Sequence, residues 1–281
     1  MDFRTIIPID SGDFQIEPLE DKLFVGSCFA TNIGNRFAED KFRATVNPLG
    51  VMYNPASILH TVEACGMSPR TAVFTLGTNH VYRLRQTGQI VDNCEKRPQN
   101  LFQEEELSID DCADYLQRAI EVLRQRRRDV RVILTVSPIR YRKYGYHESQ
   151  LSKSTLLLAV DKVVRGYAQP AETTGIDADR QFSVAYFPAY EIIMDELRDY
   201  RFYAADMLHP SEQAVEYIWQ RFAETYFSPA THNFLAQWLP IKAALNHRPF
   251  NPNSEDYRLF REKTCKAESE LMEKYAAYEQ L

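Results

Sequence analysis

KLFVGSCFA, at residues 22–30, joins a short apolar run to a tight Gly-Ser turn and the start of a second apolar pattern. The apolar residues at 23–25 are typical of a buried strand. Residues 30–41 then have the spacing of a helix with one apolar face. A strand that passes directly into a helix is the repeating unit of folds built on a parallel sheet.

The same unit recurs along the chain. The runs predicted to be strands are residues 23–26, 43–47, 72–77, 131–137 and 182–187. Helices are predicted at residues 30–41, 55–65, 108–127, 150–167 and 211–226, and Ser108 with Asp111 resembles a capping box. This alternation predicts an α/β fold, in which a parallel sheet is flanked by helices.

The pattern changes after Tyr226. Ser228 and Pro229 interrupt it, and the residues beyond them predict helices and no further strand. Residues 251–254 predict a turn and a helix N-cap. We therefore predict a core domain at residues 1–228 and a helical appendage at residues 229–281. The appendage is expected to cover the core; a contact between copies in a homo-oligomer, or a lid over the site, is the alternative.

The charge pattern argues against a nucleic-acid partner. The net charge is −6, and acids and bases are interspersed. One basic run, residues 124–131, follows acids at residues 104–106 and 110–111, which predicts a helix that begins with acids and ends with bases. We find neither a secretion signal nor a stretch of about 18 apolar residues, so we expect a cytoplasmic protein with no membrane partner.

Cysteine and histidine spacing predicts neither disulfides nor a metal site. The five cysteines are scattered and odd in number, so we expect reduced thiols: Cys28, Cys65, Cys94, Cys112 and Cys265. Histidines 60, 80, 147, 232 and 247 lack the spacing of metal ligands. No cofactor is expected.

Polar residues gather where predicted strands end, which is where open parallel sheets bind ligands. Ser27 follows the first strand, Asn79 follows the third, and Asp206 and His209 lie beyond the fifth. With this spacing the carboxylate can accept from one imidazole nitrogen and leave the other to take a proton from a nucleophile. The three motifs together predict a nucleophile, an oxyanion donor and a base.

GSCFA, at residues 26–30, is the signature of the GSCFA family, which this sequence resembles and which is itself similar to SGNH (GDSL-like) hydrolases. Those hydrolases have four blocks: Gly-Asp-Ser, a Gly, Gly-x-Asn and Asp-x-x-His. Ser27, Gly77 with Asn79, and Asp206 with His209 match three blocks, and Gly50 is the candidate for the fourth. The sequence departs from Gly-Asp-Ser in that Cys28 follows the serine and the acid is absent.

The resemblance implies a three-layer α/β/α sandwich with a five-stranded parallel sheet, and a serine esterase that acts on a small-molecule or carbohydrate ester. The catalytic residues would then be Ser27, His209 and Asp206. Ser27, Asn79 and Gly50 would form the oxyanion hole. Alternatives are an acyltransferase with the same triad, a binding module without turnover, and Cys28 as nucleophile; Ser27 is preferred over Cys28 because of its place in the motif.

The residues expected to contact substrate lie at the same edge of the sheet. Gly77, which has no side chain, would allow the substrate to come close to the backbone. Arg140 and His147, in a loop predicted at residues 138–150, would bind an anionic or sugar-like substrate. A solvated loop is the equal alternative.

Overall fold

The computed structural model describes residues 4–12, 14–92, 94, 97–168 and 182–280. Its centre is a five-stranded parallel sheet with the strand order β2-β1-β3-β7-β8. The strands are β1 (Lys22–Gly26), β2 (Ala44–Val46), β3 (Thr71–Leu76), β7 (Arg131–Val136) and β8 (Ser183–Tyr186). Each strand coincides with a predicted run to within a residue at either end, so the predicted parallel sheet is confirmed.

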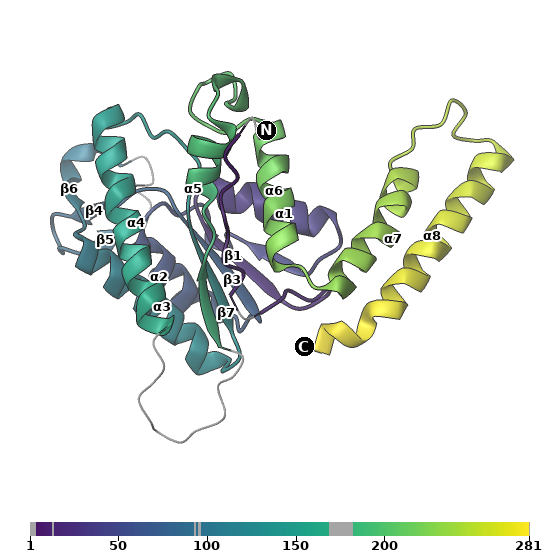
Figure 1. Ribbon diagram of the computed structural model, residues 1–281, viewed down its shortest axis with the longest axis horizontal. Coiled ribbons are helices and arrows are strands. Elements are labelled where there is room, and N and C mark those ends of the chain that lie inside the picture. The colour runs from purple at the N-terminus through teal and green to yellow at the C-terminus, as the bar shows by residue number, and fades with distance from the viewer. Residues whose placement is uncertain (1–3, 13, 93, 95–96, 169–181, 281) are drawn as a thin grey trace.

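Side chains that alternate along the strands divide the core into two layers. Leu23 and Val25 point to one face of the sheet, and Phe24 points to the other. The first face is covered by α2 (Pro55–Cys65), α3 (Ile109–Arg126) and α4 (Tyr146–Ala168), and the second by α1 (Cys28–Glu39) and α6 (Glu212–Tyr226). Figure 1 shows these helices on either side of the sheet, which confirms the three-layer sandwich.

Helix caps appear where the sequence predicts helix starts. Ser108 and Asp111 form the predicted capping box of α3. Asn54 and Ser211 cap α2 and α6 through their side-chain oxygens. The exception is α4, which begins at Tyr146 rather than near residue 150 and therefore includes His147 in its first turn instead of the predicted loop.

A second, antiparallel sheet with the order β5-β4-β6 was not predicted. It consists of β4 (His80–Leu84), β5 (Ile90–Val91) and β6 (Phe102–Glu106), with a short 3₁₀ turn at Gln99–Leu101. The acids at 104–106 thus lie in a strand, and only Asp110 and Asp111 occupy the first turn of α3. The expectation that all these acids begin one helix is wrong, because pairing of β6 with β4 overrides the local charge pattern.

Beyond β8, short α5 (Ala189–Glu191), a π-helical turn (Ile192–Leu197) and a 3₁₀ turn (Tyr200–Phe202) lead to α6. Then follow α7 (Pro229–Leu245), α8 (Glu255–Tyr275) and a 3₁₀ turn (Ala276–Gln280). Helices α7 and α8 form a hairpin that projects from the sandwich (Figure 1). Its inner residues Phe234, Trp238 and Leu271 join the core beside α1, while the domain boundary at residue 228 stays a prediction.

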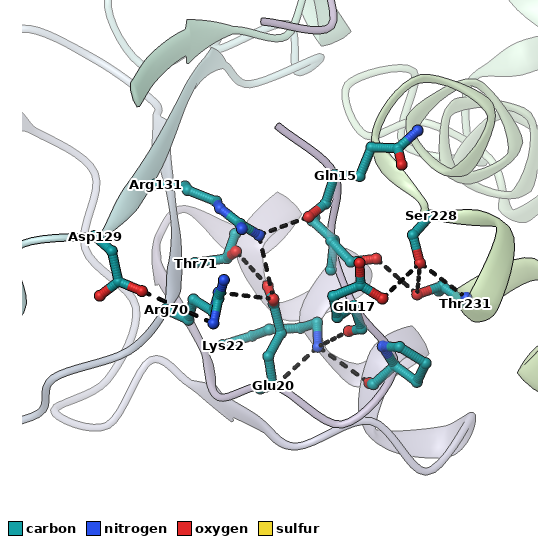
Figure 2. Close-up of polar contacts among 12 residues, drawn as sticks. Gln15, Glu17, Glu20, Lys22, Arg70, Thr71, Asp129, Arg131, Ser228 and Thr231 are labelled. Carbon is teal, nitrogen blue, oxygen red and sulfur yellow. Dashed lines mark hydrogen bonds and ion pairs between the residues drawn. The ribbon is translucent and has the colours of Figure 1, made fainter. Parts of the chain in front are cut away.

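The amino-terminal edge of the sheet contains a buried polar cluster (Figure 2). Glu20, which is fully buried, accepts from the Thr71 hydroxyl at 2.6 Å and lies 3.3 Å from the Arg131 guanidinium. Lys22 is also buried and donates to the carbonyls of Glu17, Pro18 and Glu20 at 3.1, 3.2 and 2.9 Å. These contacts fix the segment that precedes β1 against the starts of β3 and β7.

No described helix is both long and apolar enough to cross a membrane.

Candidate active site

The turn after β1 depends on Gly26. Its φ of 141° is unfavourable for other residues, and a Cβ at this position would lie 2.1 Å from the Thr75 carbonyl oxygen. Because Gly26 has no side chain, the end of β1 can pass close to β3. The Ser27 N–H donates to the same Thr75 carbonyl at 3.0 Å. The next two side chains, those of Ser27 and Cys28, therefore emerge at the carboxyl edge of the sheet.

Ser27 is the N-cap of α1, and its hydroxyl points into the protein. Its Oγ accepts from the Phe29 N–H at 3.2 Å and lies 2.6 Å from Ser137 Oγ and 3.0 Å from Thr75 Oγ1. Only 1% of Ser27 is exposed. The predicted nucleophile is thus surrounded by a helix end and two other hydroxyls, and His209 is not among its hydrogen-bond partners in the described chain.

Cys28, the first residue of α1, faces the histidine instead. Its Sγ lies 3.6 Å from His209 Nε2. Burial raises the pKa of the Cys28 thiol, while its own N–H, Lys153 and the Phe29 N–H act in the opposite direction. A thiol whose pKa is raised needs a base to take its proton, and His209 is in position to do so.

Asp206 orients this histidine. His209 Nδ1 lies 2.6 Å from Asp206 Oδ2, and Asp206 Oδ1 accepts from the backbone N–H groups of Leu208 and His209 at 2.9 and 3.0 Å. The hydrogen bond from His209, followed by those from the two N–H groups, lowers the pKa of Asp206 to about 2. Because the carboxylate can only accept, Nδ1 carries the proton and Nε2 is left as the acceptor that faces Cys28.

Arg140 holds the loop that carries this pair. Its N–H donates to the Leu208 carbonyl at 3.0 Å, and its guanidinium donates to the Met207 carbonyl at 3.2 Å. The guanidinium also lies 4.7 to 5.5 Å from the ring centres of three tyrosines, Tyr146, Tyr200 and Tyr203. Arg140, predicted to bind substrate, therefore has a structural task on the loop, and any contact with substrate stays a prediction.

The thiol and the imidazole open into a pocket of about 370 Å³. Its lining comprises Cys28, Tyr53, Ile139, Arg140, Tyr141, Arg142, Lys143, Leu208 and His209. Burial, and then the negative charge of a Cys28 thiolate, raises the pKa of the Tyr53 hydroxyl. His147, which is exposed on α4, is not part of this lining.

The predicted oxyanion donors do not line the pocket. The N–H groups of Ser27 and Gly50 donate to the carbonyls of Thr75 and Asn47, at 3.0 and 2.8 Å. The Asn79 side-chain amide donates to the Leu107 carbonyl at 2.8 Å. Gly77 packs under Tyr53, where a Cβ would lie 3.2 Å from the tyrosine ring, so the missing side chain allows close packing of the chain, and contact with substrate stays a prediction.

Lys153 was missed as a site residue by the sequence analysis. Its side chain lies beneath this site, where Nζ donates to the carbonyls of Gly77 and Ser137 at 2.9 and 3.0 Å. A lysine on the apolar side of the predicted helix 150–167 was the available signal. Cys28 was not missed, because it is the alternative nucleophile of the sequence analysis; it stands third, after Gly26 and Ser27, where Gly-Asp-Ser has its serine.

The pocket lining combines one thiol with one imidazole and has no set of metal ligands. Among the residues the structure describes, no three His, Cys, Asp or Glu side chains cluster to hold a metal ion. The arrangement provides a thiol, an adjacent base and a carboxylate that orients the base. These are the groups that nucleophilic attack requires.

The chain matches the models of the GSCFA family along most of its length. The model of the GSCFA family matches residues 22–69 and 61–222, and that of the GSCFA domain protein, C-terminal domain, matches residues 238–279. A search of curated proteins gives no significant match.

Two solved structures resemble the fold. A carbohydrate esterase family 3 protein from Talaromyces cellulolyticus aligns with 73% of this chain and 95% of its own, at 12% identity and a TM-score of 0.40. A mutant acetyl esterase, crystallised with acetate ion, aligns with 79% of this chain and 99% of its own, at 11% identity and a TM-score of 0.43. At these values neither protein assigns an activity to this chain.

Proposed function

We propose that this chain, which belongs to the GSCFA family, hydrolyses small acyl esters with Cys28 as the nucleophile, His209 as the base and Asp206 as its orienting acid. The observation that carries the proposal is the line of contacts from Cys28 Sγ to His209 Nε2 and from His209 Nδ1 to Asp206, at 3.6 and 2.6 Å. Three side chains in this order match the nucleophile, base and orienting acid of a catalytic triad. The buried hydroxyl of Ser27 instead supports the helix start.

In the proposed reaction, His209 Nε2 takes the proton from the Cys28 thiol while Sγ forms a bond with the acyl carbon. The negative charge that develops on the carbonyl oxygen would be stabilised by the Cys28 N–H, since the first N–H groups of a helix have no acceptor within it. Collapse breaks the bond to the alcohol oxygen, which receives the proton from His209. A thioester remains on Cys28.

Water completes the cycle. His209 takes a proton from a water molecule, whose oxygen attacks the thioester carbon, and the carbon–sulfur bond breaks. The acid is released and the thiol regains its proton from His209. The His209 and Asp206 side chains are 43% and 44% exposed, which supports access of water and favours hydrolysis over transfer to a second alcohol.

The pocket supports a small substrate. Its volume of about 370 Å³ is near the lower limit of ligand sites and suits a short acyl chain better than a long one. Three basic side chains, Arg140, Arg142 and Lys143, are part of its lining, while none of the described lining residues is Asp or Glu. An ester that carries a negative charge fits this lining best.

The test is to find the acylated residue. Purified protein is mixed with p-nitrophenyl acetate and quenched during turnover, and the acyl adduct is located by peptide mass spectrometry. We expect a thioester on Cys28 that hydroxylamine removes. Cys28→Ala should lose the adduct and at least a thousandfold of turnover, because removal of a triad nucleophile leaves only binding contributions.

Ser27→Ala is the matched control at the neighbouring position. It should keep the Cys28 adduct and lose about 1 kcal/mol of stability, the usual cost of an N-cap. An adduct on Ser27, or labelling of Ser27 by a fluorophosphonate, would return the nucleophile to the serine. Repeating the assay with sugar acceptors separates hydrolysis from acyl transfer, and full turnover in Cys28→Ala would refute the proposal.

A further inference from the structure

The segment that carries the proposed base, residues 204–209, is closed on itself by hydrogen bonds. The Ala204 N–H donates to the His209 carbonyl at 2.8 Å, and the Met207 N–H donates to the Ala204 carbonyl at 2.9 Å. The Asp206 carboxylate accepts from the N–H groups of Leu208 and His209 and from the imidazole. These bonds give the segment its shape, but they do not fix its place in the protein.

Arg140 supplies most of the attachment to the rest of the chain. Within the described residues, the hydrogen bonds that reach residues 204–209 from distant parts of the chain come from Arg140 and Cys28. The Arg140 N–H donates to the Leu208 carbonyl at 3.0 Å, and its guanidinium donates to the Met207 carbonyl at 3.2 Å. The contact of Cys28 is the one between Sγ and His209 Nε2, at 3.6 Å. The place of the imidazole beside the thiol therefore depends on Arg140.

Met207, which accepts from the guanidinium, has an unfavourable backbone conformation. Its φ of 59° lies in the left-handed region, which costs free energy for a residue with a Cβ. Its side chain does not secure the turn by burial, since Met207 is 45% exposed. A conformation of this kind persists only where surrounding contacts hold it. The bond from Arg140 to the Met207 carbonyl is such a contact.

The guanidinium is itself held in place. It lies 4.7, 5.5 and 5.4 Å from the ring centres of Tyr146, Tyr200 and Tyr203, which belong to α4 and to the segment before α6. Cation–π contacts of this kind are favourable. A guanidinium that contacts three rings and donates to a carbonyl is committed to this turn, so the attraction of a negatively charged substrate is left to the other basic residues of the pocket, Arg142 and Lys143.

We infer that Arg140 is a positioning residue, which holds the turn at Met207 and Leu208 so that His209 Nε2 meets Cys28 Sγ. The inference rests on the proposed roles of Cys28 and His209, and it gives Arg140 no contact with substrate. Misplacement of a catalytic group by about 1 Å can cost about a hundredfold in rate. A residue that acts on the backbone of this turn can therefore control the reaction without touching the reacting atoms.

The experiment measures whether His209 still acts on Cys28. The rate at which iodoacetamide alkylates Cys28 at pH 7.5 is followed by mass spectrometry of its peptide, in the wild type, Arg140→Met, His209→Ala and the double variant. In the wild type, loss of the base beside the thiol should slow alkylation at least about tenfold. Arg140→Met should slow it by a similar factor. His209→Ala should then add less than about a twofold loss, because residues that act as a unit are not additive.

Three results of this cycle would overturn the inference. The first is an equal effect of His209→Ala with and without the Arg140 guanidinium, because the two residues would then act independently. The second is the absence of any effect of His209→Ala in the wild type. The third is faster alkylation in Arg140→Met, which would show that Arg140 only shields the thiol.

Arg142→Met is the matched control. Arg142 lies in the same loop and lines the same pocket, but its side chain is exposed and has no hydrogen bond to residues 204–209 within the described chain. Arg142→Met should leave the effect of His209→Ala on alkylation at its wild-type size. If Arg142→Met also abolished that effect, the loop as a whole would be responsible, and the assignment to Arg140 would be wrong.

Turnover separates positioning from substrate binding. Two acetyl esters are compared, neutral p-nitrophenyl acetate and the negatively charged 4-acetoxybenzenesulfonate. Arg140→Met should lower kcat for both esters about a hundredfold with little change in KM. A rise in KM confined to the charged ester would make Arg140 a substrate-binding residue and would contradict the inference.

Arg140→Lys covers the case in which Arg140→Met does not fold. The ammonium can still donate to the Met207 carbonyl but lacks the planar fork of the guanidinium, so the same cycle should show a smaller slowing of the same sign. Wild-type alkylation and turnover in both variants would refute the inference. Alkylation does not involve ester hydrolysis, so a failure of the proposed function is seen separately, in the turnover of Cys28→Ala.

Discussion

Each end of the parallel sheet buries a lysine, but the two are surrounded differently. At the amino edge, Lys22 donates to three carbonyls, and burial lowers its pKa to about 7 although Glu20, Asp21 and Glu17 oppose this effect. At the carboxyl edge, Lys153 donates to two carbonyls, and burial lowers its pKa to about 7 as well. The two lysines therefore differ in the charges around them: carboxylates oppose the effect of burial on Lys22, whereas no carboxylate of the described chain pairs with Lys153.

The two edges also differ in how deeply their other charged groups are buried. Around Lys22, the carboxylate of Glu20 contacts Thr71 and Arg131, and all three are buried (Figure 2). At the other edge, the Asp206 and His209 side chains are nearly half exposed. Buried charges with partners destabilise a protein when one partner is removed, whereas exposed reactive groups can be changed with little effect on folding. We therefore expect changes at the amino edge to affect stability and changes at the carboxyl edge to affect the proposed reaction.

The largest effect should follow from Asp206→Asn at the carboxyl edge. The amide would favour the wrong histidine tautomer, so turnover of p-nitrophenyl acetate should fall about ten-thousandfold. Since the pKa of Asp206 is about 2, its carboxylate is ionised throughout pH 4 to 9, and the same loss is expected over that range. Thermal melts should match the wild type. Turnover within tenfold of the wild type would remove Asp206 from the mechanism.

The next effect should follow from Glu20→Gln at the amino edge. A buried guanidinium would lose its carboxylate, and the free energy of unfolding in urea should fall by about 3–5 kcal/mol. Turnover per folded molecule should stay the same. Glu17→Gln is the control, because the amide can still accept from the Ser228 hydroxyl that Glu17 binds at 2.8 Å, and its loss should be about 1 kcal/mol or less. Equal losses of stability from Glu20→Gln and Glu17→Gln would contradict the claim that the buried ion pair of Glu20 is important for stability.

The smallest effect concerns the pH dependence of Lys22. Its pKa is about 7 in the folded protein, against 10.5 as the ordinary value, so between these values the unfolded chain binds one proton more. The stability of the wild type relative to Lys22→Met should therefore rise as the pH rises, by about 2 kcal/mol from pH 7.5 to 9.5 in urea unfolding. Lys266→Met, at an exposed lysine, should show no such trend. If the difference in stability between the wild type and Lys22→Met did not change with pH, burial would not lower the pKa of Lys22.

Much of the fold could be predicted because its signals are local. Alternation in β1 and the apolar spacing of α3 are both present in short windows, and both elements appear where they were expected. Strand β6 was missed because Phe102–Glu106 is short and acidic, and only its pairing with β4 makes it a strand. The start of α4 was missed by a few residues for a similar reason, since helix ends respond to neighbours as well as to sequence.

The site was predicted only in part. Asp206 and His209 lie within one turn of each other, so their contact depends on local spacing and was expected from the sequence. For the nucleophile, the sequence favours Ser27 with Cys28 as the alternative, and our proposal favours Cys28; the two residues are adjacent and differ in backbone direction. Ser27 is an extended N-cap with ψ 178°, whereas Cys28 is the first helical residue, so the two side chains leave the turn on different sides.

By itself, then, the sequence determined the parallel sheet, its helices, and which reactive residues follow its strands, because these depend on patterns within a few residues. Only the tertiary structure decided which of them meet. Asn79 and Gly50 donate their hydrogen bonds to backbone carbonyls, Ser27 turns inward, and Lys153 reaches from α4 to the carbonyls of Gly77 and Ser137. Contacts between residues far apart in the chain depend on how helices and strands pack, and that packing is a property of the whole core.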